Sequence, residues 1–408
     1  MNDLGGSRSR FENRAAESTG SASHNNLNDA HDVSLAELAL VFLKLGTIAF
    51  GGPAAHIAMM EQEFVRRRCW LTEGEFLDRL GMANLIPGPS STEVAIFIGY
   101  TKRGWKGLLL AGCCFILPAA ILVAAIAAVY VRFGSLPQVG GILYGIKPAV
   151  IAIILQALWS LARTAVKSWL LAVIGVIAIV LSAVGVAPLA VLAIAGIASS
   201  VAMWSKRREA SALTGVPVAT KFGLIVVSVA AVAAAPVTLL RLFLSFLKIG
   251  SVVFGSGYVL LAFLRTEFIQ HLHWLTEKQL IDSVAVGQFT PGPVFTTATF
   301  IGYVVAGIPG AVVATVGIFV PGFLLVAVSG PLLPRLRRSA VAVSVLDGVV
   351  VGSLALMAVV AWQLGRAAIV DWVTLVIMVV SAGLLLRFRM NSAWIICGAA
   401  VAGWLARG

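Results

Sequence analysis

The sequence predicts an all-α polytopic membrane protein whose two homologous halves form an inverted repeat with broken, partly re-entrant helices. Three observations carry this prediction. The 408 residues are 59% hydrophobic and only 12% charged, with a mean hydropathy of +0.97, whereas soluble domains carry about a quarter charged residues. One pattern of charged, aromatic and proline residues occurs twice. The basic residues behind the net charge of +12 stand in short clusters between apolar runs, as the positive-inside rule produces, so nucleic acid is not the expected partner.

Composition divides the chain into four parts. Residues 1–33 are polar and lack the apolar stretch of a signal peptide, so we expect a disordered N-terminal tail. The first repeat is predicted over 34–205 and the second over 222–408. Between them, 206–221 is basic at its start and then contains glycine and proline, which predicts a loop.

The first repeat opens with an apolar segment that ends in Phe50-Gly-Gly-Pro53. Thr72 and Glu75 have the spacing of a capping box, which predicts a short helix from there to Leu85. Pro87-Gly-Pro89 then interrupts the apolar pattern. A helix cannot continue through this tripeptide, because two amide donors are missing and the glycine frees the backbone.

Longer apolar runs follow the break. Residues 107–131 are uncharged and long enough to span a bilayer. The uncharged run 168–205 is too long for one span and contains Gly185 and Pro188, so we predict a hairpin of two helices. The second repeat follows the same order, with its own break at Pro291-Gly-Pro293.

The repeat is visible residue by residue. Shifted by 204 positions, the two halves align without a gap over almost fifty residues. Charged and aromatic residues match in place, which shared hydrophobicity alone cannot produce. The matched segments are Phe42–Gly46 with Phe246–Gly250, Glu63-Phe64 with Glu267-Phe268, Trp70–Glu73 with Trp274–Glu277, Asp78 with Asp282, and Pro87–Pro89 with Pro291–Pro293.

The charges that do not match indicate the orientation of the halves. Lys102, Arg103 and Lys106 follow the first break, whereas the equivalent 304–309 is uncharged. The next loop reverses this difference, because the first repeat has only Arg132 there and the second has a basic cluster at 335–338. Since basic loops favour the cytoplasm, equivalent loops are predicted to face opposite sides of the membrane.

Two helix breaks at matched positions indicate a transport site. Broken backbone at membrane depth is tolerated only where it is buried in protein or lines a watery cavity. Broken helices in corresponding positions of two halves are the best sequence pointer to a binding site. A helix that begins at Pro89 or Pro293 would aim its free amide donors and the positive end of its dipole at an anion.

These motifs resemble the chromate ion transporter family in its long, two-domain form. The resemblance extends over nearly the whole chain from Leu35, and it rests on the paired Phe-Gly-Gly and Phe-Gly-Ser, Trp-Leu-Thr-Glu and Pro-Gly-Pro motifs. It implies a multi-pass protein of the bacterial inner membrane that exports chromate, with some relatives linked to sulfate. Transport of sulfate or another oxyanion, or an anion channel, are the alternatives. An enzyme is not expected, because the sequence has no HExxH, GxSxG or P-loop pattern.

The predicted anion site combines the two breaks with nearby donors. Hydroxyl and amide side chains flank each break, although any single hydroxyl could equally cap its helix. A lysine lies at the same position of each repeat and holds the anion or reaches to the interface. The predicted substrate-binding residues are Lys44, Gly51, Gly52, Asn84, Pro87, Gly88, Pro89, Ser90, Ser91, Thr92, Lys248, Gly255, Ser256, Gln288, Pro291, Gly292, Pro293, Thr296 and Thr297.

Three acids are candidates for coupling transport to protons: Glu63, Glu93 and Glu267. For the matched pair Glu63 and Glu267, ion pairing with nearby arginines is the stronger expectation. Glu93 has no acidic counterpart, so it is either proton-linked or interfacial. Charge movement or proton exchange would supply the drive. The expected partners are chromate, or sulfate in its place, and the lipid bilayer; a homodimer is one assembly open to the chain, and neither cofactor nor metal is expected.

Overall fold

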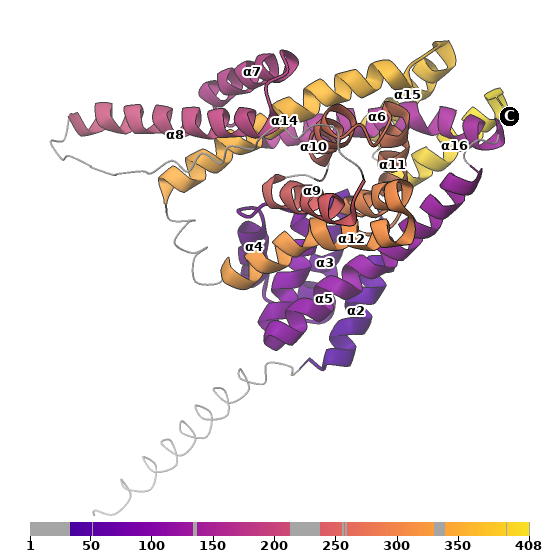
Figure 1. The fold of residues 1–408 in the computed structure, drawn as a ribbon. Coiled ribbons are helices and arrows are strands. Elements are labelled where there is room, and N and C mark those ends of the chain that lie inside the picture. Colours follow the sequence, from indigo (N-terminus) through magenta and orange to yellow (C-terminus); the bar gives the residue numbers. More distant parts are fainter. Residues whose placement is uncertain are drawn as a thin grey trace, which may run out of the picture.

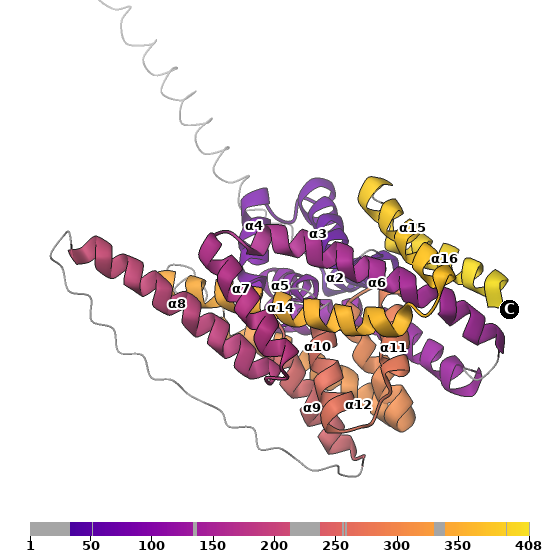
Figure 2. The ribbon, with the colours of Figure 1, turned by 90° about the horizontal axis from the view of Figure 1, so that it is seen from above.

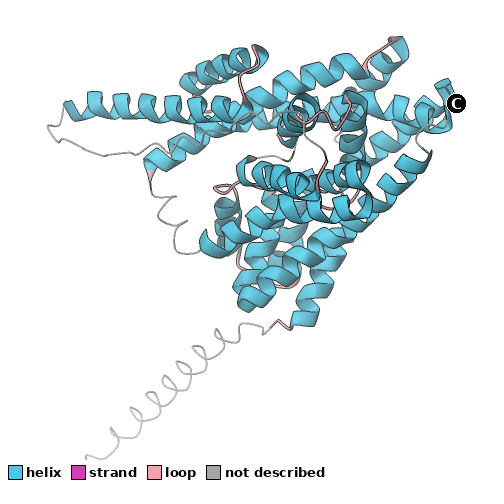
Figure 3. Ribbon diagram, in the orientation of Figure 1, coloured by secondary structure: helices cyan, strands magenta, loops and turns pink. Residues whose placement is uncertain are grey.

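A computed structural model describes residues 33–50, 52–133, 137–212, 237–254, 257, 259–329, 339–388 and 390–407. Within these ranges every regular element is a helix, and the helices pack side by side in one body (Figures 1 and 3). Four helices are long and apolar enough to cross a membrane, and four shorter apolar helices accompany them. The all-α, multi-pass prediction is therefore confirmed. The predicted tail, up to residue 32, and most of the predicted loop 206–221 lie outside the described residues, while α8 continues into that loop as far as Ala212.

The two halves agree element by element, which confirms the repeat. Most helix starts in the second half lie 203 or 204 residues after those in the first; the exceptions are α10, which starts 208 residues after α3, and α12, which starts 207 residues after α5 because the turn η3 precedes it. The equivalent pairs are α2 (Leu35–Ile48) with α9 (Leu239–Val252), α3 (Gly52–Glu61) with α10 (Leu260–Leu264), the π-helical turns η1 (Gln62–Arg67) with η2 (Arg265–His271), α4 (Glu73–Ala83) with α11 (Glu277–Phe289), α5 (Ser90–Phe133) with α12 (Thr297–Ser329, preceded by the 3-10 turn η3, Val294–Thr296), α6 (Pro137–Ala165) with α14 (Ala340–Ala368), α7 (Trp169–Ala183) with α15 (Trp372–Phe388), and α8 (Pro188–Ala212) with α16 (Ser392–Arg407).

Local signals set the helix starts that lead into the breaks. The Thr72 side chain accepts from the Glu75 amide, and the Glu75 carboxylate accepts from the Thr72 amide at 2.8 Å, so the predicted capping box is confirmed. Thr276 and Gln279 form the same box at the start of α11. The predicted hairpin is also confirmed, since α7 ends before Gly185, whose φ is +88°, and α8 starts at Pro188.

Helices α5 and α12 each contain a sharp reversal. Arg103 and Gly104 leave the helical conformation in α5, as do Ala306 and Gly307 in α12. A Cβ on Gly99 would overlap the carbonyl oxygen of Gly107, so the chain folds back on itself there. The half-helix before the first reversal, 90–102, is roughly 20 Å long, too short to cross the ~30 Å hydrocarbon layer. The predicted broken, re-entrant helices are therefore present, and each Pro-Gly-Pro lies at the inner end of a half-helix.

Three packing units result. We call α2–α5 the first broken-helix unit, α9–α12 the second broken-helix unit, and α6–α8 with α14–α16 the scaffold (Figure 2). The broken-helix units pack on each other through α5 and α12. One hydrophobic cluster joins the second unit to the scaffold, whereas another is confined to the first unit and Val326. The second unit therefore adheres to the scaffold more closely than the first.

The inverted orientation can be tested with one equivalent pair of exposed residues. Trp105 and Ile308 follow the two helix reversals, and their side chains are 60% and 69% exposed. We expect Trp105→Cys to react with an impermeant maleimide from the cytoplasmic side and Ile308→Cys from the opposite side, because only the first loop is basic. Labelling of both cysteines from one side would contradict the inversion.

Candidate functional site

The two Pro-Gly-Pro breaks dock reciprocally on the opposite repeat. The Gly88 amide donates to the carbonyl oxygen of Val253 at 2.7 Å, and the Gly292 amide donates to that of Ala49 at 2.9 Å. Val253 and Ala49 are the equivalent residues that end α9 and α2. Because each repeat offers the same groups to the other, an approximate twofold axis relates the breaks, as in an isologous interface. The breaks therefore meet between the two broken-helix units.

Glycine is required at both breaks. Gly88 has φ +137° and Gly292 has φ +94°, which side chains rarely adopt. A Cβ on Gly88 would overlap the Oε1 atom of Glu93, and a Cβ on Gly292 would lie 2.7 Å from the Cβ of Ala119. Close approach of neighbouring groups, as well as backbone conformation, selects glycine here.

A buried histidine organises the first break. The Nε2 atom of His56 lies 2.9 Å from the carbonyl oxygen of Ala49, and Nδ1 lies 3.3 Å from the Ser91 hydroxyl. Since a carbonyl oxygen only accepts, Nε2 carries the proton and Nδ1 accepts from Ser91 in the neutral ring. His56 thus ties the end of α2 to the first turn of α5.

Two buried side chains at this break have no protein partner in the described part of the chain. Thr92 Oγ1 and both carboxyl oxygens of Glu93 are buried without a hydrogen bond. The Glu93 carboxyl lies between Gly88 and Gly322 of α12, where a Cβ would be 3.8 Å from Oε1. Burying an unpaired carboxylate costs several kcal/mol, so this group is neutral or meets a ligand.

The second break is apolar by comparison. Leu260 replaces His56, and Val294 and Phe295 follow the proline in place of two serines. Thr296 Oγ1 donates to the carbonyl oxygen of Pro293, and Thr297 Oγ1 to that of Val294, each at 2.8 Å. These hydroxyls satisfy their own turn, which was the alternative interpretation of any single hydroxyl. The ionisable side chains, His56 and Glu93, are therefore at the first break.

The matched lysines and glutamates lie on α2, α9 and the π-helical turns. Lys248 Nζ is 2.8 Å from Glu267, while Lys44 is exposed on the equivalent face of α2. Glu63 pairs with Arg67 at 2.9 Å and Arg68 at 2.8 Å. Glu63 thus has the arginine partners expected for the matched acids, whereas Glu267 pairs with a lysine instead.

Some of the remaining predicted site residues lie at helix ends, and others lie outside the described residues. Asn84 is the C-cap of α4, where its backbone N–H donates to the carbonyl oxygen of Leu80, and Gln288 is buried near the end of α11. Gly52 begins α3. Gly51, Gly255 and Ser256 lie outside the described residues.

Sequence reasoning missed His56 and Gly322. His56 stands alone in the sequence and belongs to no metal-ligand pattern, so its residue type does not point to a site. The available signal was asymmetry, since His56 and Glu93 are polar residues of the first repeat whose counterparts, Leu260 and a threonine, do not ionise.

A mutant cycle distinguishes an anion-holding lysine from a structural one. If Lys248 contacts the anion, Lys248→Gln should weaken anion binding whether or not Glu267 is also replaced. If it only balances Glu267, the Lys248→Gln, Glu267→Gln double variant should recover the function that the single variant loses. The ion pair predicts recovery; apparent affinity and folded protein level are the measurements.

Two homologous helical units whose half-helices meet between them form the architecture of secondary membrane transporters. A family model described as chromate transporter matches residues 36–200 and 240–404. The chain belongs to this family. Similar proteins are the chromate transport protein of Cupriavidus metallidurans, 32% identical over 93% of this chain and 95% of the relative, and the probable chromate transport protein of Synechococcus elongatus, 33% identical over 84% and 88%. The chromate transport protein of Pseudomonas aeruginosa is 29% identical over 91% and 92%. No solved structure matches the chain.

Proposed function

We propose that the chain exports chromate across the bacterial inner membrane, with the anion held at the first Pro-Gly-Pro break where the two repeats meet. One observation supports the site: the Thr92 hydroxyl and the Glu93 carboxyl are buried there without a hydrogen-bond partner among the described residues. The family and its chromate-transporting relatives support the substrate. Sulfate, another tetrahedral dianion, is the alternative substrate, and a channel is the alternative mechanism.

The donors available to the anion can be counted group by group. The Gly88 and Gly292 amides are already bound to carbonyl oxygens, and the Thr92 and Glu93 amides donate to Pro89 at 2.8 and 3.1 Å. The remaining groups are the Ser91 amide, the Thr92 hydroxyl and, when protonated, the Glu93 carboxyl. The positive end of the half-helix dipole adds to their attraction.

Membrane potential suffices to drive export of a dianion. Each charge moved across 100 mV contributes about 2.3 kcal/mol, so two negative charges leaving the negative interior contribute roughly 4.6 kcal/mol. That corresponds to about three orders of magnitude in concentration ratio. No proton exchange is needed for export on these numbers.

Glu93 gives transport a dependence on pH. An ionised carboxylate beside a dianion would repel it, whereas a protonated one donates a hydrogen bond. The proton therefore has to be on Glu93 when the anion binds, and it stays on the carboxyl while the anion is exported. Glu63 and Glu267 are less suited to this role, because each is already in an ion pair.

Uptake of labelled chromate into inverted membrane vesicles tests the proposal. We expect saturable uptake that needs an imposed potential, positive inside the vesicle, and that exceeds uptake by vesicles without the protein. Sulfate, molybdate and phosphate serve as competitors, and stronger inhibition by sulfate than by unlabelled chromate would reassign the substrate. Non-saturating flux would favour a channel.

A further inference from the structure

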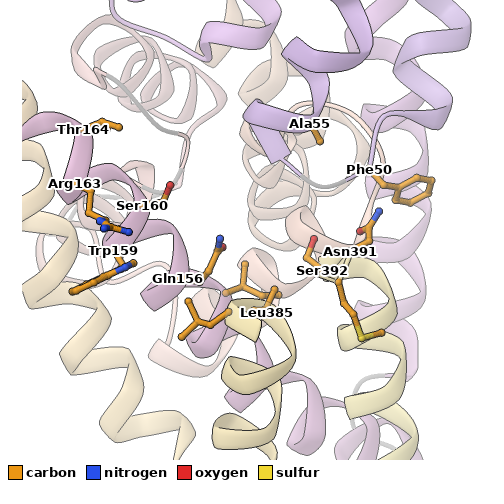
Figure 4. A pocket seen from close by; sticks show the side chains of 13 residues that line it. Phe50, Ala55, Gln156, Trp159, Ser160, Arg163, Thr164, Leu385, Asn391 and Ser392 are labelled. Carbon is orange, nitrogen blue, oxygen red and sulfur yellow. The ribbon is translucent and has the colours of Figure 1, made fainter. Parts of the chain in front are cut away.

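Two cavities separate the broken-helix units from the scaffold. The larger, about 810 Å³, lies between α6, the α15–α16 junction and the first unit, where it reaches Phe50 and Ala55 beside the end of α2 (Figure 4). Its polar lining includes Gln156, Ser160, Arg163 and Asn391. The smaller, about 130 Å³, lies against α10, η2, α14 and the α7–α8 turn.

The cavities occupy equivalent places in the two repeats. Ile153, Gln156 and Ser160 of α6 line the larger one, and their counterparts 203 residues later, Leu356, Val359 and Gln363 of α14, line the smaller. The scaffold on the other wall also matches, since Leu385 corresponds to Ser182 and Ser392 to Pro188. One architectural site thus occurs twice, with unequal volumes.

The packing of α3 and α10, the helices that follow α2 and α9, explains why the two cavities differ in volume. In the second unit, α10 packs on α14, and Val259 and Ala262 are only 2% and 1% exposed. In the first unit, the equivalent Ala55 is half-buried and Ala58 is exposed. Among the described residues, α3 has no comparable contact with α6. This packing leaves the cavity of the second repeat small and that of the first repeat large.

The open cavity lies at the basic end of the scaffold. Helix α6 ends between Arg163 and Lys167, and α15 has Arg387 in its last turn. The turn beside the small cavity, 184–187, is uncharged. Since basic loops favour the cytoplasm, the large cavity faces the cytoplasm.

The two cavities also differ in how their arginines are bound. Arg163 lies over the Trp159 ring at 5.8 Å and forms no ion pair with a described residue. Arg265, in the small cavity, is paired with Glu277 at 2.6 Å. An arginine in a cavity with no carboxylate partner among the described residues attracts anions.

We propose that the two cavities are the two vestibules of one transport pathway, that this structure is the state open to the cytoplasm, and that Arg163 forms an entry subsite for a tetrahedral oxyanion in the open vestibule. In the opposite state α3 packs on α6 and α10 separates from α14. The entry subsite rests on the proposed function. The assignment of one open and one closed vestibule does not depend on the substrate.

Cysteine labelling tests the vestibules without any substrate. Ala55→Cys and Val259→Cys are equivalent positions, each placed in a background whose 4 native cysteines are replaced by serine. In inverted vesicles, an impermeant maleimide should modify Ala55→Cys about tenfold faster than Val259→Cys, as one dominant state requires. Ser160→Cys and Gln363→Cys repeat the comparison on the scaffold wall if either first variant folds poorly. Equal rates, or labelling of Ala55→Cys only from the periplasmic side, would overturn the assignment.

Transport kinetics test the entry subsite. Arg163→Gln should raise the KM for chromate uptake into inverted vesicles about tenfold at unchanged protein level, because it removes the attracting charge. Arg366→Gln removes the equivalent arginine at the other end and should leave this KM unchanged. An unchanged KM in Arg163→Gln rejects the subsite. Asymmetric labelling in a protein that moves no chromate would instead retain the vestibules and reject the substrate.

Discussion

Replacing Gly88 by valine is expected to abolish chromate transport while the protein still inserts into the membrane. The residue has φ +137°, and a Cβ there would overlap the Glu93 carboxyl. Valine would therefore move the carboxyl, strain the backbone by about 1–3 kcal/mol and disturb the hydrogen bond to Val253. Initial rates of uptake into inverted vesicles, normalised to folded protein, measure the loss, for which more than about tenfold is expected.

Gly104 supplies the matched control for this experiment. It also has a left-handed backbone, with φ +55°, but a Cβ there would meet nothing within 4 Å. Gly104→Val shares the backbone penalty without the local overlap, so it should retain transport. Pro89→Ala, which lets the α5 half-helix extend backwards, should lose transport like Gly88→Val. Near-normal rates in Gly88→Val and Pro89→Ala would mean that the break only shapes the scaffold.

Glu93→Gln is expected to keep transport and remove its decline at high pH. The wild-type carboxyl must hold a proton when the dianion binds, so the competent fraction falls as pH rises through its titration. Beyond that point the apparent Kd should rise about tenfold per pH unit. Glutamine is neutral at every pH and still donates a hydrogen bond, so the variant's Kd should follow only the ionisation of chromate itself.

Two variants serve as controls for the pH dependence of Glu93→Gln. Glu61→Gln removes an acid that pairs with Arg66 at the surface, and its pH profile should match the wild type. His56→Gln removes the other titratable group at the break and should keep the pH slope that Glu93 imposes, whatever it does to affinity. A wild-type pH profile in Glu93→Gln would exclude Glu93 as the proton-binding group.

Local and repeated features were predictable from the sequence. The capping box at Thr72, the turn at Gly185 and the alignment of Pro87–Pro89 with Pro291–Pro293 depend on residues close in sequence or on a fixed shift. The reciprocal contacts of the breaks were not predictable, because they join backbone groups of opposite repeats, and backbone groups leave no residue signature.

The chemistry of the site was predictable only in part. The sequence identified Glu93 as an acid without a counterpart, but its isolation depends on Gly88 and Gly322, which come from different repeats. Ala55 and Val259 are equivalent in sequence but differ in burial, because only the second of the two units packs its helix on the scaffold here. The sequence match between the repeats would be the same if the first unit did so instead.

The exchange of hydrogen bonds between the breaks has a consequence for chains that carry one repeat. Such a chain would have to find the acceptors supplied here by Ala49 and Val253 on a second copy inserted in the opposite orientation. Both breaks of that dimer would carry the same side chains, so an acid at one would be an acid at both, close to a single dianion. Joining the repeats in one polypeptide lifts this restriction, so that one half can hold the titratable groups while the other keeps an apolar, tightly packed turn.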